Sequence, residues 1–198
     1  MATHDVNLGI GNYAESGITG MFYHAPAGTA LPTSPSESLA AAWVEVGAIS
    51  EDGISFNPNW SFEKLKNWAK QVERTTPSDE TGTISAPIID TTEESFKTVF
   101  GADHVTITAA NATHGKLISV DVTAASMPEA EAYLFLMKDD DDMIMIGTTK
   151  GFITELAEVA FQPDAAITWN PTISADTWTF MKDDGQVIGA TGATGATP

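Results

Sequence analysis

Several segments in the second half of the chain have the hydrophobic pattern of β-strands. Apolar and polar positions alternate over 105–109 and 116–122, whereas 133–137 and 143–146 are short continuous apolar runs. The last two flank four consecutive aspartates, 139–142, which predicts a hairpin with an acidic turn. Trp169 and residues 178–181 continue the pattern, and Asp184 with Gly185 predicts a turn into a strand over 186–188. The second half of the chain is therefore predicted to be mainly β.

The first half of the chain is less regular. Residues 1–40 are rich in Gly, Ala, Ser, Thr and Pro, which predicts an arm, a short strand and a long loop. Residues 43–49 are typical of a strand, and the turn-forming residues 50–53 predict a hairpin with a second strand over 54–56. A strand pattern resumes at 83–89 after a polar stretch. These β segments extend the prediction over the whole chain.

One helix is predicted over about 92–100. Thr91 is a suitable N-cap, Glu94 stands three residues later as in a capping box, and Gly101 predicts the end of the helix. The apolar face consists of Phe96, Val99 and Phe100. Glu93 and Glu94 lie in the first turn, where the helix dipole favours acidic residues. This structural role explains their presence without a catalytic one.

Two further segments have ambiguous or conflicting patterns. From Ser61 to Val72, the apolar positions recur at helical spacing, so periodicity predicts a short amphipathic helix. Those positions are Phe62, Leu65, Trp68, Ala69 and Val72. Residues 152–161 fit a helix and a strand equally well.

The charge of the chain limits the classes of partner. Its 198 residues include 27 acidic and 9 basic ones, for a net charge of −18. Because affinity for nucleic acid comes largely from Lys and Arg contacts with phosphate, this balance argues against a nucleic-acid binder. An acidic surface would suit a conduit in which DNA must not stick, although solubility alone also accounts for such a charge.

Composition also bears on the compartment. The chain has no cysteine, which excludes disulfides and thiol chemistry and fits synthesis in a reducing cytoplasm. The N-terminus resembles no secretory signal, and no apolar run approaches the roughly 20 residues of a membrane-spanning helix. We therefore expect no membrane partner.

No motif for catalysis, a cofactor or a metal is recognisable. The four histidines lie in no metal-ligand spacing, and a calcium-binding loop that starts at Asp139 would place Met143 and Lys150 at ligand positions. Phosphate-binding glycine motifs and a nucleophile elbow are absent from the sequence. The sequence thus predicts a protein that is not an enzyme and that has no catalytic, cofactor or metal site.

A group of aromatic and basic residues instead predicts an association surface, because aromatics beside Lys or Arg are typical of interfaces. The candidate residues are Trp60, Phe62, Lys64, Leu65, Lys66, Trp68, Lys70 and Arg74, which include four of the nine basic residues. Trp43 is a further aromatic residue that the sequence places with this group. The alternative is that these aromatics pack on the domain's own sheet.

The order of these segments resembles the major tail tube proteins of long-tailed (siphovirus-type) bacteriophages, particularly those of actinobacteria. The resemblance covers roughly residues 40–185 and rests on five segments: Trp43–Ile54, Glu63–Trp68, Thr83–Glu94, Glu158–Thr168 and Asp176–Asp184. It implies a β-sandwich or barrel-like domain with one flanking helix. It also implies self-assembly into hexameric rings, which stack into a tube around a DNA channel.

The resemblance gives further expectations. The loop over about 53–82 is expected to reach neighbouring subunits in an extended form, which conflicts with a helix at 61–72. The candidates for inter-subunit or lumen contacts are Asp139, Asp140, Asp141 and Asp142. The N-terminal arm is a further candidate for contacts between rings.

Tape measure and tail terminator proteins are the expected further partners, and the virion is the expected location. The expected division is an arm, strand and loop over 1–40, the tail tube domain over 41–188 and a flexible Gly-Ala-Thr end over 189–198.

One alternative from another class remains at this stage. An acidic β-sandwich without chemical motifs also fits a secreted or surface binding module for carbohydrate or protein ligands. Such a protein would carry a signal sequence in its precursor.

Overall fold

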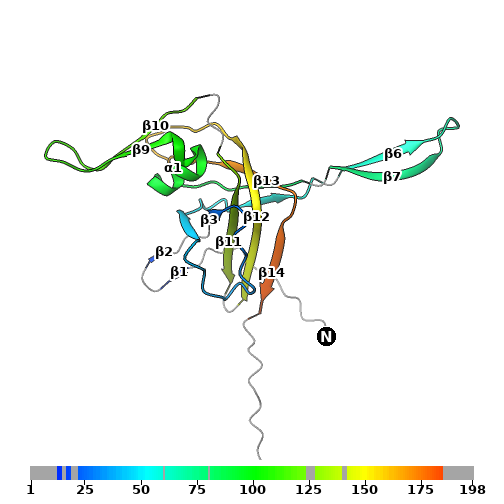
Figure 1. Ribbon diagram of the computed structural model, residues 1–198, viewed down its shortest axis with the longest axis horizontal. Helices are drawn as coiled ribbons and strands as arrows, with labels where there is room; N and C mark the ends of the chain where they lie inside the picture. Colours follow the sequence, from blue (N-terminus) through cyan, green and yellow to red (C-terminus); the bar gives the residue numbers. More distant parts are fainter. Residues whose placement is uncertain are drawn as a thin grey trace, which may run out of the picture.

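The computed structural model describes residues 13–14, 17–18, 22–59, 61–79, 81–123, 128–139 and 142–184. The fold is mainly β with one short α-helix, and its sheets do not close into a barrel, which confirms the predicted mainly β class (Figure 1). Among the described helices, none is long and apolar enough to cross a membrane.

An antiparallel sheet forms the body of the molecule, with the strand order β4-β3-β11-β12-β13-β8-β5 and with β14 also paired to β12. Its strands are β3 (Phe22–Pro26), β4 (Val44–Gly47), β5 (Ser55–Asn57), β8 (Gly82–Ser85), β11 (Glu131–Asp139), β12 (Asp142–Leu156), β13 (Pro171–Ala175) and β14 (Thr179–Asp183). A separate short pair, β1 (Tyr13–Ala14) with β2 (Gly17–Ile18), precedes them.

The long strand β12 belongs to both halves of this sheet. Its first part lies between β11 and β14, whereas its second part pairs with β13. The register shifts between Glu131 and Tyr133 of β11 and between Ile153 and Glu155 of β12, and such bulges bend and twist a strand. Side chains from both halves consequently meet in one hydrophobic core.

Strand β11 is buried on both faces. Tyr133, Phe135 and Met137 point into the main core, and Phe22 of β3 stacks on Phe135 with ring centroids 4.6 Å apart. The alternate residues Ala132, Leu134 and Leu136 enter a second cluster, which also contains Trp43 and the partly buried Leu31 and Leu39 of the connection that follows β3. Burial on both faces explains why residues 132–137 are an unbroken apolar run.

The predicted helix is present as α1 (Glu93–Phe100), but its N-cap is Thr92 and not Thr91. The Thr92 Oγ1 accepts a hydrogen bond from the Ser95 amide (3.2 Å), and the Ser95 Oγ accepts one from the Thr92 amide (2.8 Å). Ser95 therefore completes the capping box in place of Glu94. Gly101 ends the helix as predicted, with φ of 87°. A short 3₁₀ turn, η1 (Ala102–His104), follows.

The predicted hairpin over 43–56 is wrong. A turn does form at Ser50, whose carbonyl accepts a hydrogen bond from the Gly53 amide (3.0 Å), but the strands on either side diverge. Strand β4 pairs with β3 and β5 pairs with β8, at opposite ends of the sheet. Between them, Ile49 bridges to Ile88, which draws the chain away from β4.

Two hairpins project from the body. The first consists of β6 (Ser61–Lys66) and β7 (Val72–Asp79), and the second of β9 (Val105–Thr108) and β10 (Leu117–Val120). They extend toward opposite sides of the molecule (Figure 1). We call them the β6–β7 arm and the β9–β10 arm. The prediction of strands at 105–109 and 116–122 is confirmed, and the ambiguous segment 152–161 is a strand as far as Leu156.

The helix predicted over 61–72 is wrong, because this segment forms β6, the tip and the first residue of β7. The register of the hairpin shifts between Ser61 and Phe62 and again between Leu65 and Lys66. Its apolar residues are therefore distributed over both faces and the tip, and they do not line one helical stripe. The extended form implied by the family resemblance is the correct one.

Candidate assembly surface

The β6–β7 arm ends in a tightly turned tip. The amide of Asn67 donates to the Gln71 carbonyl (2.9 Å) and the amide of Lys70 donates to the Asn67 carbonyl (2.9 Å), which closes a three-residue loop. Lys70 has φ of 61°, as expected for the left-handed residue that ends this type of loop. The Asn67 side chain accepts from the Gln71 amide (3.0 Å) and donates to the carboxylate of Glu73 (2.5 Å). The tip therefore holds a defined shape and presents Trp68 to the outside.

Large apolar side chains on this arm are exposed. Phe62 is 61 % exposed, Leu65 is 64 % exposed, and Trp68 is fully exposed at the tip. None of the three belongs to either hydrophobic cluster of the described residues. A two-stranded hairpin alone is marginally stable in water, and a group of exposed apolar residues marks an interaction site. These exposed side chains make the arm a candidate association surface.

The basic residues of the arm are also without acidic partners among the described residues. No salt bridge in that part of the chain involves Lys64, Lys66, Lys70 or Arg74. By contrast, Lys97, Lys116 and Lys182 each pair with an acid. The cross-strand register places Lys64 on the face that carries Phe62, and Arg74 opposite Leu65 on the other face. Both faces therefore combine apolar and positively charged groups.

The structure thus collects the predicted association residues into one arm, with two qualifications. Trp60 lies outside the described residues. Trp43, which the sequence grouped with the exposed aromatics, is buried in the second cluster. Trp43 therefore packs on the domain's own sheet, which is the alternative that the sequence left open for these aromatics.

At another end of the body, acidic residues cluster around the β11–β12 hairpin. The hairpin is confirmed, with Asp139 paired to Asp142 at its end, whereas Asp140 and Asp141 lie outside the described residues. The Asp142 carboxylate pairs with the Lys182 ammonium of β14 (3.0 Å). This ion pair neutralises part of the charge of the four aspartates 139–142, which are the predicted candidates for inter-subunit or lumen contacts.

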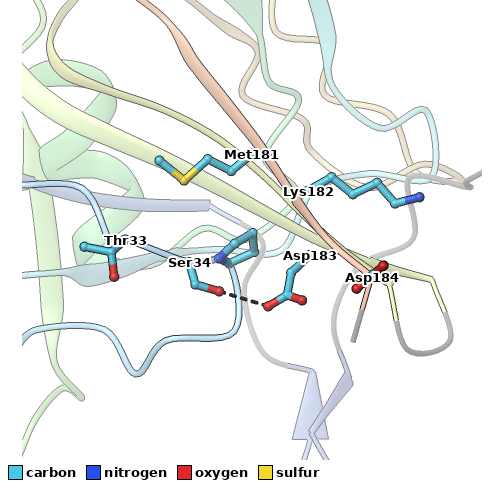
Figure 2. A pocket seen from close by; sticks show the side chains of 7 residues that line it. Thr33, Ser34, Met181, Lys182, Asp183 and Asp184 are labelled. Atoms are coloured by element: carbon cyan, nitrogen blue, oxygen red, sulfur yellow. Dashed lines mark hydrogen bonds between the residues drawn. The ribbon is translucent and has the colours of Figure 1, made fainter. Parts of the chain in front are cut away.

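A shallow hollow beside this hairpin is lined by Thr33, Ser34, Pro35 and residues 181–184. Figure 2 shows the Ser34 hydroxyl pointing toward Asp183. The Asp183 carboxylate accepts hydrogen bonds from the hydroxyls of Ser34 (2.9 Å) and Ser36 (2.7 Å), so it fastens the loop after β3 to β14. Sequence reasoning missed this contact, because about 150 residues separate its partners and no local pattern connects them.

The N-terminal end of α1 carries a compact set of ion pairs. Glu93 pairs with Lys97 one turn later (2.6 Å) and with Lys116, which immediately precedes β10. Lys97 also pairs with Glu94 (3.1 Å). The hydrogen bonds from Lys116 and Lys97 lower the pKa of Glu93, and the hydrogen bond to Glu93 raises the pKa of Lys97. Glu93 therefore ties the β9–β10 arm to the helix.

This arrangement predicts an acid-sensitive attachment of the arm. A carboxyl whose folded pKa is lowered contributes stability above its ordinary pKa of about 4.3, and this is lost as pH falls through the lowered value. We expect amide exchange in residues 105–120 to speed up, relative to β11, below about pH 4. In Glu93→Gln the arm should already show the faster exchange at pH 7. A Glu63→Gln variant on the other arm is the control, and an unchanged exchange pattern in Glu93→Gln would contradict the role of the pair.

The described residues contain no group of three or more His, Asp or Glu side chains arranged to hold a metal ion. His24 lies between two carboxylates, with its Nδ1 2.9 Å from Glu131 and its Nε2 3.8 Å from Glu94. It thereby joins β3 to β11 and approaches α1. We regard this cluster as structural.

Comparisons with known proteins add independent information. A family model described as "Phage tail tube protein" matches residues 14–186. No curated protein sequence matches the chain. Among solved structures, the cap that terminates the tube of the anti-feeding prophage is similar at a TM-score of 0.44 and 11 % identity. That match covers 92 % of this chain and 97 % of the other.

Proposed function

The chain belongs to the phage tail tube protein family, and on this premise we propose that copies of it assemble into rings, which stack into the tube of a phage tail. The family resemblance implies six copies in each ring. The observation that carries the proposal is the β6–β7 arm, which exposes apolar and basic side chains that its own body does not cover. In a tube, a neighbouring copy covers the arm.

Charge supports this kind of contact. The chain is strongly acidic overall, whereas the arm concentrates four of its nine basic residues. An arm docked on an acidic neighbour therefore gains electrostatic complementarity, which sets orientation and partner choice. The exposed Phe62, Leu65 and Trp68 would supply the apolar centre of the contact.

The edges of the body sheet provide a second mode of association. Strand β4 pairs only with β3, and β14 only with β12, among the described strands. Unpaired strand edges readily accept another strand through main-chain hydrogen bonds. We propose that sheets of successive copies join edge to edge within a ring, while the β6–β7 arm reaches across to a neighbour.

The role of the assembled tube would be passive. Phage DNA would pass along the channel without specific binding, because an acidic wall repels phosphate. Tape measure and tail terminator proteins are the further partners of this proposal, and a long-tailed phage virion is its location. The proposed role requires no catalytic step, cofactor or metal.

Electron microscopy of the purified protein tests the proposal directly. At high protein concentration, negative staining should show rings and tubes of constant diameter with a central channel. Averaged end-on views would give the symmetry. A preparation that contains only discrete monomers at every concentration and salt level would overturn the proposal.

A further inference from the structure

The β9–β10 arm has one apolar face, which the cross-strand register defines. Ile107 pairs with Ile118, and Val105 pairs with Val120, so these four β-branched side chains share a face. Thr106, Thr108, Leu117 and Ser119 form the opposite face. We call the first set the isoleucine face.

The body covers only the base of the isoleucine face. Val120 packs against the main core, and Val105 is half-buried. Farther out, Ile107 is 38 % exposed, and Ile118 is half-buried and belongs to neither hydrophobic cluster of the described residues. The apolar surface of the core thus continues along the arm to two isoleucines that the chain's own residues cover only in part.

The charge of the β9–β10 arm differs from that of the chain as a whole. Residues 105–120 contain no Asp or Glu, although 27 of the 198 residues of the chain are acidic. The basic residue Lys116 is paired with Glu93. An arm without acids is not repelled by a second acidic copy as an acid-rich surface would be.

The tip of the arm is held in one conformation. The Asn111 Oδ1 accepts hydrogen bonds from the Thr113 amide (2.8 Å), the Thr113 hydroxyl (2.7 Å) and the His114 amide (3.1 Å). The His114 ring lies between the Asn111 Nδ2 (2.8 Å) and the Gly115 carbonyl (2.7 Å). A loop ordered in advance loses less entropy on binding, which favours an exposed arm that docks.

We propose that the β9–β10 arm is a second self-association surface, whose isoleucine face packs against another copy of this chain. The inference rests on the proposed tube. Because the two arms extend toward opposite sides (Figure 1), each reaches a different neighbour, and such head-to-tail contacts can close into a ring. The surface assigned here is separate from the β6–β7 arm.

Neighbouring positions on the two faces give matched variants. Ile107→Glu and Ile118→Glu place a charge on the isoleucine face, whereas Thr106→Glu and Ser119→Glu place the same charge on the opposite face of the same strands. We expect the first pair to lower tube yield by about tenfold or more, as for a charge buried in an interface, and the second pair to have little effect. Yield is measured by sedimentation, and circular dichroism checks the fold of each variant.

A labelling experiment avoids dependence on the folding of the charged variants. Because the chain has no cysteine, Ile107→Cys and Thr106→Cys each provide a single thiol for a maleimide probe. In wild-type-like tubes, we expect labelling at position 107 to be slowed about tenfold or more relative to the free protein, and labelling at position 106 to be slowed much less.

The outcomes separate this inference from the proposed function. Tubes that form normally but label equally fast at both positions would overturn the role of the isoleucine face and leave the tube intact. Normal tubes from Ile107→Glu and Ile118→Glu would do the same. Failure of the unmodified protein to form any tube would overturn the proposed function itself.

Discussion

Reversing the charge of Lys64, Lys66, Lys70 and Arg74 to glutamate is expected to abolish tube formation while leaving the melting temperature of the free protein nearly unchanged. These side chains form no ion pair within the described residues and lie on an arm outside both hydrophobic clusters. Their replacement therefore costs the folded body little. Four negative charges in their place would repel an acidic neighbour instead of attracting it.

The measurement compares tube yield with thermal unfolding for the same preparations. Glutamine at the four positions removes the attraction without adding repulsion, so it should give an intermediate yield. Lys138→Glu with Lys150→Glu adds charge on the body, where both residues are exposed, and serves as the control. Unchanged tube yield after charge reversal would remove these four charges from the interface.

Salt provides a second readout of the same contact. If ion pairs of the β6–β7 arm dominate assembly, raising the salt concentration should lower tube yield in the unmodified protein. If repulsion between acidic copies dominates, assembly should instead weaken at low salt. In the variant with glutamine at the four positions, raising the salt concentration should no longer lower tube yield.

Phe135→Ala is expected to lower the free energy of unfolding by about 3–5 kcal/mol, a large part of the stability of a single domain. Phe135 is fully buried in β11, and its ring stacks on Phe22 at 4.6 Å with an interplanar angle of 9°. Removing it leaves a cavity in the main core beside Phe22. Urea unfolding of the free protein measures the change.

Phe62→Ala is the matched control, because it removes the same side chain from the exposed β6–β7 arm. We expect it to change the free energy of unfolding by less than about 0.5 kcal/mol, while it lowers tube yield. An equal loss of stability in both variants would contradict the separation between body and arm.

Local patterns predicted much of the fold. The strands at 133–137 and 143–146 and the hairpin between them follow from two short apolar runs on either side of an acidic turn, a pattern that spans only a few residues. The helix followed from its capping residues and Gly101, although a choice between adjacent threonines placed the N-cap one residue too early. In each case the determining interactions lie close together in sequence.

Pairings between distant segments could not be predicted in the same way. Strands β4 and β5 are separated by a good turn sequence, yet each pairs with a strand far from the other. Their partners are selected by burial in the body sheet, which no local pattern records. The segment 61–72 shows a related limit, because its spacing of apolar residues fits a helix until two register shifts redistribute them.

The two arms differ in how visible they are in the sequence. The residues of the β6–β7 arm stand out in the sequence as a candidate association surface, because tryptophan, phenylalanine and four basic residues are unusual together, although their spacing predicts a helix. The sequence of the β9–β10 arm predicts only two strands, because Val, Ile and Thr are also the residues of an ordinary buried sheet. Its significance depends on the exposure of Ile107, which only the structure provides.

The opposite directions of the two arms have a consequence for how a tail would grow. Two free copies that meet in solution can use one docking contact, whereas a copy that joins a partly built ring can engage neighbours on both sides. The second contact is then nearly intramolecular and adds to the first at little extra entropic cost. Starting a polymer is consequently slow and extending it is fast, so the number of tubes would be set by whatever supplies the first ring.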